Sequence, residues 1–347
     1  MTENTDTRKP SRLRGFLKYT GLTVLFCAIL LALFTAVGSV LMPRNSTEAG
    51  RTESRAYGFV SEPENTIDVL FMGDSLASTA FFPMRIWSDS GITSYVCSGN
   101  GEQISYALGM LGTFLDCQSP KVVFLETQML YNKFDAGLAV KQVVKDFLPI
   151  IEYHQRWKQL TLDDLLGTDD GSDQVSCLKG SNPKALYQAA DTSNYMTASD
   201  EVERPGTLNV MVLKMLVQMC EEKGVKFVLV STPQVQDWSY ARHNGCAQVA
   251  EELGIDFIDM NTDPVSSEVG IDWSLDSRDA GMHLNYRGAD KVSDWMASYL
   301  SQNYGLADHR SDESYSQWND CLEQYTEYMA KVAKDPEEYD VPGKHMY

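Results

Sequence analysis

The chain has 347 residues, of which 43% are hydrophobic and 10% aromatic, enough for a large folded core. It carries 48 acidic against 29 basic residues, a net charge of -19 at pH 7. Basic residues cluster only at the N-terminus. The charge therefore argues against nucleic-acid binding, which needs clustered Lys and Arg at the phosphates.

The first element in chain order is an apolar segment. No charged residue lies between Tyr19 and Pro43, and "GLTVLFCAILLALFTAVGSVLM" (21–42) has about the 20 apolar residues that cross a bilayer. Basic residues dominate 1–20, so the positive-inside tendency predicts a cytoplasmic tail there and an extracytoplasmic bulk. A signal peptide cleaved near Ala36-Val37-Gly38 is the alternative. We expect an uncleaved single-pass anchor in the cell membrane, because the apolar run continues past that site.

A polar stretch at 43–60 is expected to be a linker. Beyond it, short apolar runs predict buried strands at 67–72, 93–97, 121–127, 225–233 and 255–261. Helical patterns are expected at 102–117, 205–223, 240–253 and 286–300. Apolar strands alternating with helices favour an α/β fold, with a parallel sheet covered on both faces.

Two segments depart from this alternation. Residues 134–204 are irregular, contain the acidic "TDDGSDQVS", and are predicted to form an insertion in a domain spanning 61–305. Residues 306–347 form a tail in which apolar positions from Tyr315 to Val332 recur at spacings of three and four. This pattern predicts an amphipathic helix that docks on its own domain.

Seven cysteines are present, and one of them, Cys27, lies in the apolar segment. The other six are Cys97, Cys117, Cys177, Cys220, Cys246 and Cys321. An even number in an oxidising compartment permits disulfides. Free buried thiols are the alternative for Cys220 and Cys246. None of the six has CxxC spacing, so a zinc knuckle is not expected.

The stretch "VLFMGDSLASTAF" (69–81) places Ser75 just after a predicted strand, on the turn into a helix. Parallel sheets place their ligands at this position. The backbone N–H groups of the following turn could stabilise an oxyanion beside a nucleophilic serine. Gly-Asp-Ser also occurs as a plain turn in which Asp74 or Ser75 caps a helix. The tripeptide alone does not decide between these readings.

A nucleophilic serine needs a base, and His283 is the best candidate among five histidines. It lies in "RDAGMHLNYRGADKV", on a loop before the last core helix. Asp272, Asp276 and Asp279 precede it within eleven residues. A carboxylate on the same loop can hold the tautomer and orientation of an imidazole, as a Ser-His-Asp arrangement requires.

Taken together, "VLFMGDSLASTAF" and "DAGMHLNYRGADKV" resemble the two end motifs of the GDSL, or SGNH, hydrolase superfamily. The likeness covers roughly residues 60–302. More closely, the chain is similar to membrane-anchored extracytoplasmic members of Gram-positive bacteria, such as the proteins of alginate O-acetylation and teichoic-acid D-alanylation. The resemblance implies a three-layer α/β/α fold with a flavodoxin-like parallel sheet, a serine nucleophile, and no metal or other cofactor.

By position, the resemblance makes Ser75 the nucleophile and His283 the base. The family usually spaces its acid and base as D-x-x-H, whereas Asp279 and His283 are D-x-x-x-H. Asp279 is the first candidate for the acid; Asp276 and a Ser-His dyad stay open.

The resemblance also implies an oxyanion hole. The family's oxyanion-hole glycine falls in "CSGNGEQ". Gly99 or Gly101 is therefore the expected donor, with Asn100 nearby. The family's later G-x-N-D motif is replaced by "ETQM", where Thr127 or Gln128 would donate instead.

The expected function is that of a serine esterase or O-acyltransferase acting on an acylated cell-envelope glycan or wall polymer. Envelope acyltransferases are expected as further partners. The alternative is a catalytically inactive protein of the same fold that binds glycans or partner proteins. The missing G-x-N-D motif and the longer Asp-to-His spacing support that alternative.

Overall fold

The computed structural model describes residues 12–41, 54–148, 150–158, 160 and 176–339. The chain divides into two compact units, Met1–Pro43 with Val143–Asp170 and Arg44–Gln142 with Gly171–Tyr347. The strands of the sheet all lie in the second unit.

In the first unit, the apolar N-terminal segment forms one helix, α1 (Arg12–Leu41). Its 27-residue part Gly15–Leu41 is long and apolar enough to cross a membrane, as a membrane anchor or a signal sequence would be. Two short helical turns, α7 (Ile150–Tyr153) and η3 (His154–Lys158), belong to the same unit. Most of the expected cytoplasmic tail, 1–20, lies outside the described residues.

The second unit is built around a sheet of five parallel strands in the order β2-β1-β3-β4-β5. The strands are β1 (Val69–Gly73), β2 (Ser94–Ser98), β3 (Val122–Glu126), β4 (Lys226–Ser231) and β5 (Asp256–Asp259). Each lies within two residues of its predicted ends. The order is the flavodoxin-like one, so the predicted fold class is confirmed.

Side-chain alternation along the strands divides the core into two layers. Leu70 and Met72 of β1 point into one apolar cluster, whereas Val69 and Phe71 point into the other. Both faces of a parallel strand are thereby buried, and this explains the continuous apolar runs in the sequence.

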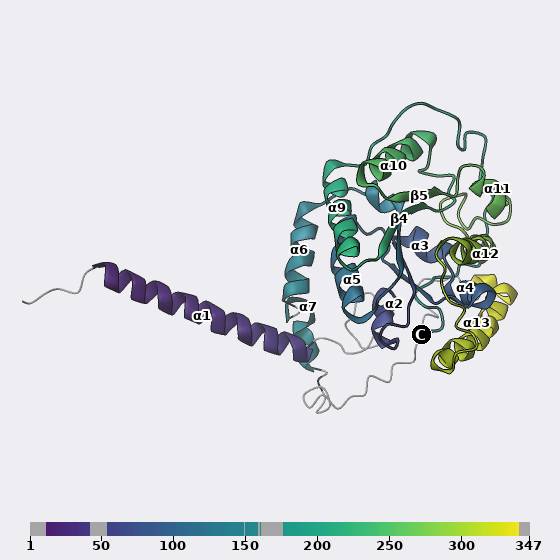
Figure 1. The fold of residues 1–347 in the computed structure, drawn as a ribbon. Helices are drawn as coiled ribbons and strands as arrows, with labels where there is room; N and C mark the ends of the chain where they lie inside the picture. Colours follow the sequence, from purple (N-terminus) through teal and green to yellow (C-terminus); the bar gives the residue numbers. More distant parts are fainter. Residues whose placement is uncertain (1–11, 42–53, 149, 159, 161–175, 340–347) are drawn as a thin grey trace, which may run out of the picture. The chain divides into compact units, whose positions relative to one another are not determined.

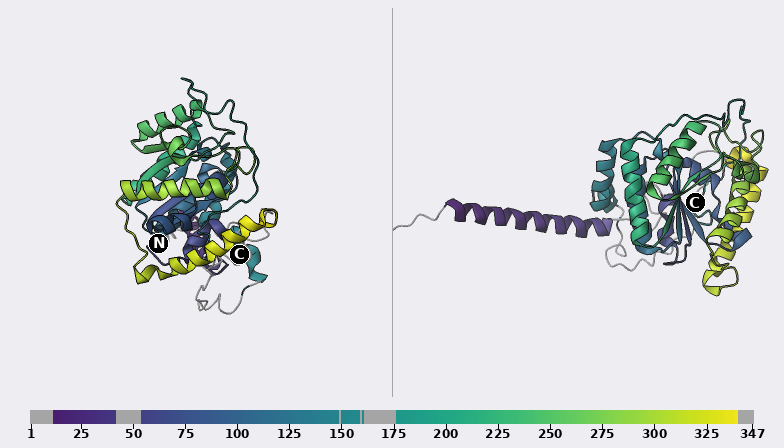
Figure 2. Two further views of the ribbon diagram at one scale, coloured as in Figure 1. Left: turned by 90° about the vertical axis from the view of Figure 1, so that its right-hand side faces the viewer. Right: turned by 45° about the horizontal axis from the view of Figure 1, so that its top comes forward.

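Helices cover both faces of this sheet (Figures 1 and 2). One face carries α5 (Ile104–Cys117), α9 (Thr207–Glu222) and α10 (Tyr240–Leu253). The other carries α3 (Ser75–Ala80), α4 (Pro83–Ser90), α11 (Val265–Val269) and α12 (Tyr286–Asn303). The remaining elements are α2 (Ser54–Tyr57), η1 (Gly58–Ser61), η2 (Thr127–Leu130), α6 (Ala136–Phe147), η4 (Glu313–Tyr315), α13 (Ser316–Lys334) and α14 (Pro336–Tyr339).

The predicted linker, 43–60, must be shortened. Its second half is helical in α2 and η1, and Phe59 is completely buried. The Phe59 ring lies 4.8 Å from that of Phe114 and 6.0 Å from that of Tyr95, measured between centroids. The linker prediction failed because it treated 43–60 as one polar stretch. Its last part, "SRAYGFV", contains four apolar residues, and Ala56, Tyr57 and Val60 pack in the same cluster as Phe59.

The predicted insertion begins with α6. After residues that lie outside the described part, it continues from Ser176 to Gly206 without helix or strand. This extended segment is held by backbone hydrogen bonds, from Asn182 N to Ser78 O (2.7 Å) and from Gln188 N to Ser277 O (2.9 Å). It therefore lies along the helix that begins at Ser75 and along the loop that leads to His283.

A buried ion pair joins this segment to the rest of the domain. The Lys179 ammonium lies 2.6 Å from Glu62 Oε1 and 4.4 Å from the ring centroid of Trp318. Neither charged side chain is more than 2% exposed. Trp318 belongs to α13, whose apolar face packs on α4 through the Trp87 ring, 5.3 Å away. The tail helix thus docks on its own domain, as its spacing predicted.

We predict that Lys179→Met lowers the thermal unfolding temperature of the full-length protein in mild detergent. The substitution leaves the Glu62 carboxyl group buried without its partner, and such a loss costs about 3–5 kcal/mol. Lys226→Met is the control, because its ion pair with Asp256 is 53% exposed on both sides and is worth at most about 1 kcal/mol. Equal unfolding temperatures for the two variants would contradict the prediction.

Candidate active site

Ser75 is the first residue of α3, at the carboxyl end of β1. Asp74 caps this helix, because its Oδ1 accepts a hydrogen bond from Leu76 N at 2.9 Å. A side chain on Gly73 would place its Cβ 2.6 Å from Ala77 Cβ and 2.8 Å from Glu126 Cβ. Glycine is therefore required for the tight turn that presents Ser75.

The structure brings Ser75, His283 and Asp279 into one hydrogen-bonded chain. Ser75 Oγ lies 2.8 Å from His283 Nε2, and His283 Nδ1 lies 2.7 Å from Asp279 Oδ2. A carboxylate only accepts, so Nδ1 carries a proton and donates it to Asp279. Nε2 of the neutral ring then accepts from the Ser75 hydroxyl. This is the arrangement in which a histidine can remove the proton of a serine.

The four-residue spacing between Asp279 and His283 is accommodated by the backbone. Ala280 and Gly281 both have positive φ angles, 57° and 97°, and turn the chain back on itself. Asp279 Oδ1 consequently accepts from His283 N at 2.7 Å while Oδ2 meets the ring. The longer spacing therefore preserves the contact between acid and base.

The other two carboxylates have different partners. Asp276 Oδ2 accepts from Lys291 Nζ at 2.6 Å and from Asp272 N at 2.7 Å. Asp272 Oδ1 accepts from the Ser274 hydroxyl. Of the three acidic residues considered, Asp279 is the one in contact with His283.

The pKa of Asp279 lies below its ordinary value. Burial by itself raises it, but the hydrogen bonds from the His283 ring and backbone outweigh this effect and lower the pKa. Asp279 is thus a carboxylate at neutral pH, as holding the Nδ1 proton requires.

Two more carboxyl groups, those of Asp74 and Glu126, lie near the turn that presents Ser75. Burial raises the pKa of Asp74, while its hydrogen bonds and the neighbouring His283 lower it in part. Glu126, at the end of β3, is completely buried. Burial raises the pKa of Glu126 well above its ordinary value, and the charge of Asp74 raises it further. The site therefore contains two carboxyl groups whose pKa is raised and one, Asp279, whose pKa is lowered.

The predicted oxyanion residues lie on loops at the same edge of the sheet. Gly99, Asn100 and Gly101 follow β2, the neighbour of β1, with Gly99 buried and the other two exposed. Gln128 lies in η2, directly after β3. No described hydrogen bond joins these residues to Ser75 or His283, so their role stays a prediction.

The orientation of the Gln128 amide follows from its partners. Gln128 Oε1 lies 3.4 Å from both Arg242 Nη1 and Gln234 Nε2. A guanidinium only donates, so the atom facing Arg242 is the carbonyl oxygen. None of the described hydrogen bonds uses the Gln128 Nε2 group, so its N–H groups can donate to another acceptor.

Asn132 was not among the site residues predicted from the sequence. Its Nδ2 donates to Asp74 Oδ2 at 3.2 Å and to Glu102 O at 2.9 Å. Both amide hydrogens are thus bound to protein, and they tie the loop after β2 to the turn before Ser75. An asparagine shortly after a strand in a parallel sheet was the available signal, but its spacing in "ETQMLYN" does not match the family motif.

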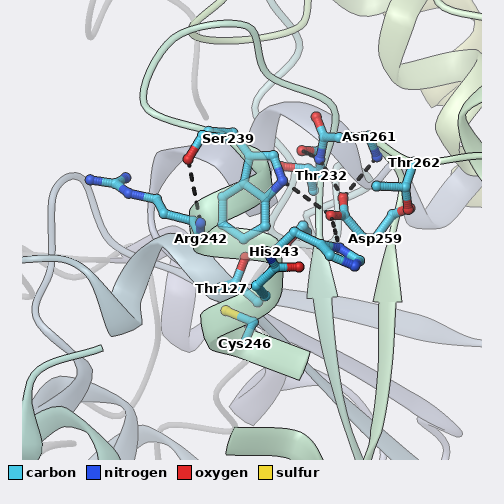
Figure 3. Close-up of polar contacts among 12 residues, drawn as sticks. Thr127, Thr232, Ser239, Arg242, His243, Cys246, Asp259, Asn261 and Thr262 are labelled. Atoms are coloured by element: carbon cyan, nitrogen blue, oxygen red, sulfur yellow. Dashed lines mark hydrogen bonds and ion pairs between the residues drawn. The ribbon is translucent and has the colours of Figure 1, made fainter. Parts of the chain in front are cut away.

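A second polar cluster lies around Asp259, at the end of β5 (Figure 3). His243 of α10 and Asn261 both bind Asp259, with His243 Nδ1 2.7 Å from Asp259 Oδ2 and Asn261 Nδ2 2.8 Å from Oδ1. Asn261 Oδ1 in turn accepts from Gln234 N. The strand end and the loop beginning at Gln234 are thereby fixed to each other.

Two residues of that loop hold the turn between Asp279 and His283. Val235 N donates to Gly281 O at 2.7 Å, and Gln236 Nε2 donates to the carbonyl oxygens of Asp279 and Ala280. The orientation of Asp279 therefore depends on this loop as well as on its own backbone.

Among known proteins, no protein-family model matches the chain and no curated protein matches it by sequence. Solved structures do match. A GDSL-like lipase from Bacteroides thetaiotaomicron is 11% identical, with 72% of this chain and 98% of that chain covered and a TM-score of 0.35. The psychrotrophic esterase EstA from Pseudoalteromonas is 14% identical, with coverages of 68% and 97% and a TM-score of 0.36.

The acetyl xylan esterase AlAXEase is 15% identical, with coverages of 67% and 100% and a TM-score of 0.35. Other matching structures include an acylhydrolase from Bacteroides fragilis and a GDSL-like lipase from Parabacteroides merdae.

We predict that Glu126→Gln flattens the pH dependence of stability. Because the pKa of Glu126 is raised on folding, its contribution is fully present below the unfolded value of 4.5 and is lost as the pH rises through the folded pKa. Between about pH 5 and pH 8, the unfolding temperature of the variant should fall less than that of the wild type.

The measurement is a series of thermal unfolding curves at fixed salt. The exposed Glu313→Gln is the control and should keep the wild-type slope. If Glu126→Gln also keeps the wild-type dependence of unfolding temperature on pH, the pKa of Glu126 is not raised by folding.

Proposed function

We propose that this chain is a membrane-anchored serine acyl-ester hydrolase or O-acyltransferase that acts outside the cytoplasm. The observation that carries the proposal is the unbroken hydrogen-bonded chain from Ser75 through His283 to Asp279. The His283 side chain is 20% exposed and that of Asp279 is 35% exposed. A substrate can therefore reach the three hydrogen-bonded residues.

The reaction follows from the positions of the protons. Ser75 Oγ attacks the carbonyl carbon of an ester as His283 Nε2 takes its proton, and Asp279 stabilises the imidazolium that forms. The negative charge then lies on the former carbonyl oxygen. His283 returns the proton to the leaving alcohol, and the acyl group remains on Ser75.

The acceptor in the second half of the reaction distinguishes the two activities. Water attacking the acyl-serine makes the protein an esterase, whereas a sugar hydroxyl makes it a transferase. In both cases His283 removes the proton of the acceptor. The Ser75 N–H, the Gly99–Gly101 turn and the Gln128 amide are the proposed donors to the oxyanion.

The proposed location rests on α1. An apolar helix of this length, preceded by a basic N-terminus, supports a single-pass anchor with the sheet domain outside. An acylated envelope glycan or wall polymer is then the substrate class within reach, and envelope acyltransferases are the proposed partners. The net charge of -19 favours a polymer whose acylated region carries little negative charge.

We predict that a fluorophosphonate probe labels the full-length protein and that Ser75→Ala abolishes this labelling. His283→Ala should reduce it strongly, because the hydroxyl loses its base. Ser78→Ala, a buried position on the same helix, is the matched control and should label normally. Equal labelling of Ser75→Ala would remove the nucleophile assignment, and absence of any labelling would favour a non-catalytic glycan-binding protein.

We predict that Gln128→Met lowers kcat for an aryl acetate by about 10²–10³-fold with little change in KM, since oxyanion donors act mainly in the transition state. Steady-state kinetics test this, with the exposed Gln218→Met on α9 as control. An unchanged kcat would leave the oxyanion to backbone donors alone.

A further inference from the structure

Two cysteines far apart in sequence meet on the side of the domain that carries α13. Cys321 lies on α13 and is buried, whereas Cys177 lies on the extended segment after Ser176 and is partly exposed. Cys177 packs against the buried cluster that contains Cys321 and Trp318, and a hydrogen bond joins the two thiols. Cys177 Sγ also lies 3.5 Å from Gln324 Oε1, on the same face of α13 as Cys321.

The other cysteines have different surroundings in the described part of the chain. Cys117 Sγ lies 3.4 Å from Thr113 O of its own helix, and Cys246 Sγ lies 3.6 Å from the Tyr131 hydroxyl. Cys97 and Cys220 are buried in the core, and Cys27 belongs to α1. Cys97 and Cys117 pack in one cluster and interact through charge. Among the described cysteines, a hydrogen bond between two thiols is found for Cys177 and Cys321.

The environment of this pair favours the thiolate form of Cys321, whereas the hydrogen bond to Cys321 and burial raise the pKa of Cys177. The buried Lys179 ammonium lies over Trp318, one turn before Cys321 on α13. The hydrogen bond from Cys177 lowers the pKa of Cys321 most, burial opposes this, and the Lys179 charge lowers it further. Thiolates at such positions are the reactive species in disulfide exchange.

We propose that Cys177 and Cys321 form a disulfide that closes α13 covalently onto the sheet domain. The oxidant is an external disulfide, such as that of an oxidoreductase or of oxidised glutathione. The proposal rests on the extracytoplasmic location proposed above for its occurrence in the cell, but the pairing itself follows from the contact.

The exchange balances in two steps. Cys177, the more exposed of the two thiols, loses its proton to water, attacks one sulfur of the external disulfide and expels the other as a thiolate. The Cys321 thiolate then attacks Cys177 Sγ in the mixed disulfide, which expels the second external thiolate. Two electrons pass from the protein thiols to the external disulfide.

The cross-link would stabilise more than the tail. The segment that carries Cys177 is bound to the sheet, where Val96 N donates to Lys179 O at 3.0 Å, and to α3, through Asn182 N and Ser78 O. Closing the loop between Cys177 and Cys321 reduces the freedom of the unfolded chain. α13 would then be fixed to the layer that holds Ser75.

The test uses the purified full-length protein in mild detergent, first reduced and then exposed to oxidised glutathione. Remaining thiols are alkylated, and the digested protein is examined by mass spectrometry. We expect a linked peptide pair containing Cys177 and Cys321, and an unfolding temperature higher by about 5 °C or more than that of the reduced protein. Cys177→Ser and Cys321→Ser should each abolish both effects.

Cys117→Ser is the matched control and should form the cross-link normally, because a serine hydroxyl can make the same hydrogen bond to Thr113 O. If both thiols of the folded protein are alkylated after oxidation, or if either cysteine is linked to a different one, the proposal is wrong. Fluorophosphonate labelling of the same samples separates the two proposals. A cross-linked protein that is not labelled would refute the proposed activity alone, and a labelled protein without the cross-link would refute the disulfide alone.

Discussion

The contact between Ser75 and His283 spans 208 positions of the sequence, and it depends on the packing of α12 over the beginning of the domain. Phe82 N, at the start of α4, donates to Ser293 Oγ of α12 at 2.9 Å, and Arg85 forms an ion pair with Asp294. Because α12 begins three residues after His283, the position of this helix sets that of the imidazole. Ser75 begins α3 directly after β1, so the hydrogen bond between serine and histidine joins two rigid elements.

Around this contact, the pKa values of two carboxyl groups are shifted in opposite directions. Asp279 is partly exposed and hydrogen-bonded by His283, and its pKa is lowered. Glu126 is completely buried, and its pKa is raised. Chemically identical groups thereby have different environments, since Asp279 binds the His283 ring and Glu126 packs beneath Gly73.

The side of the domain that carries α13 depends on one segment without regular structure. Lys179 connects Glu62 near the start of the domain with Trp318 of the tail helix. The proposed link between Cys177 and Cys321 lies next to it.

The sequence by itself determined the parallel α/β fold, the apolar helix, and Ser75 and His283 as candidate residues. Each of these depends on local patterns, such as apolar runs, glycine turns and short motifs. Only the tertiary structure decided that Asp279, and not Asp276, faces the imidazole, because this depends on the backbone turn at Ala280 and Gly281 and on support from Gln236. Packing between segments distant in sequence likewise determined the contacts of Asn132, the helical structure around Phe59 and the contact of Cys177 with Cys321. No local sequence pattern contains this information.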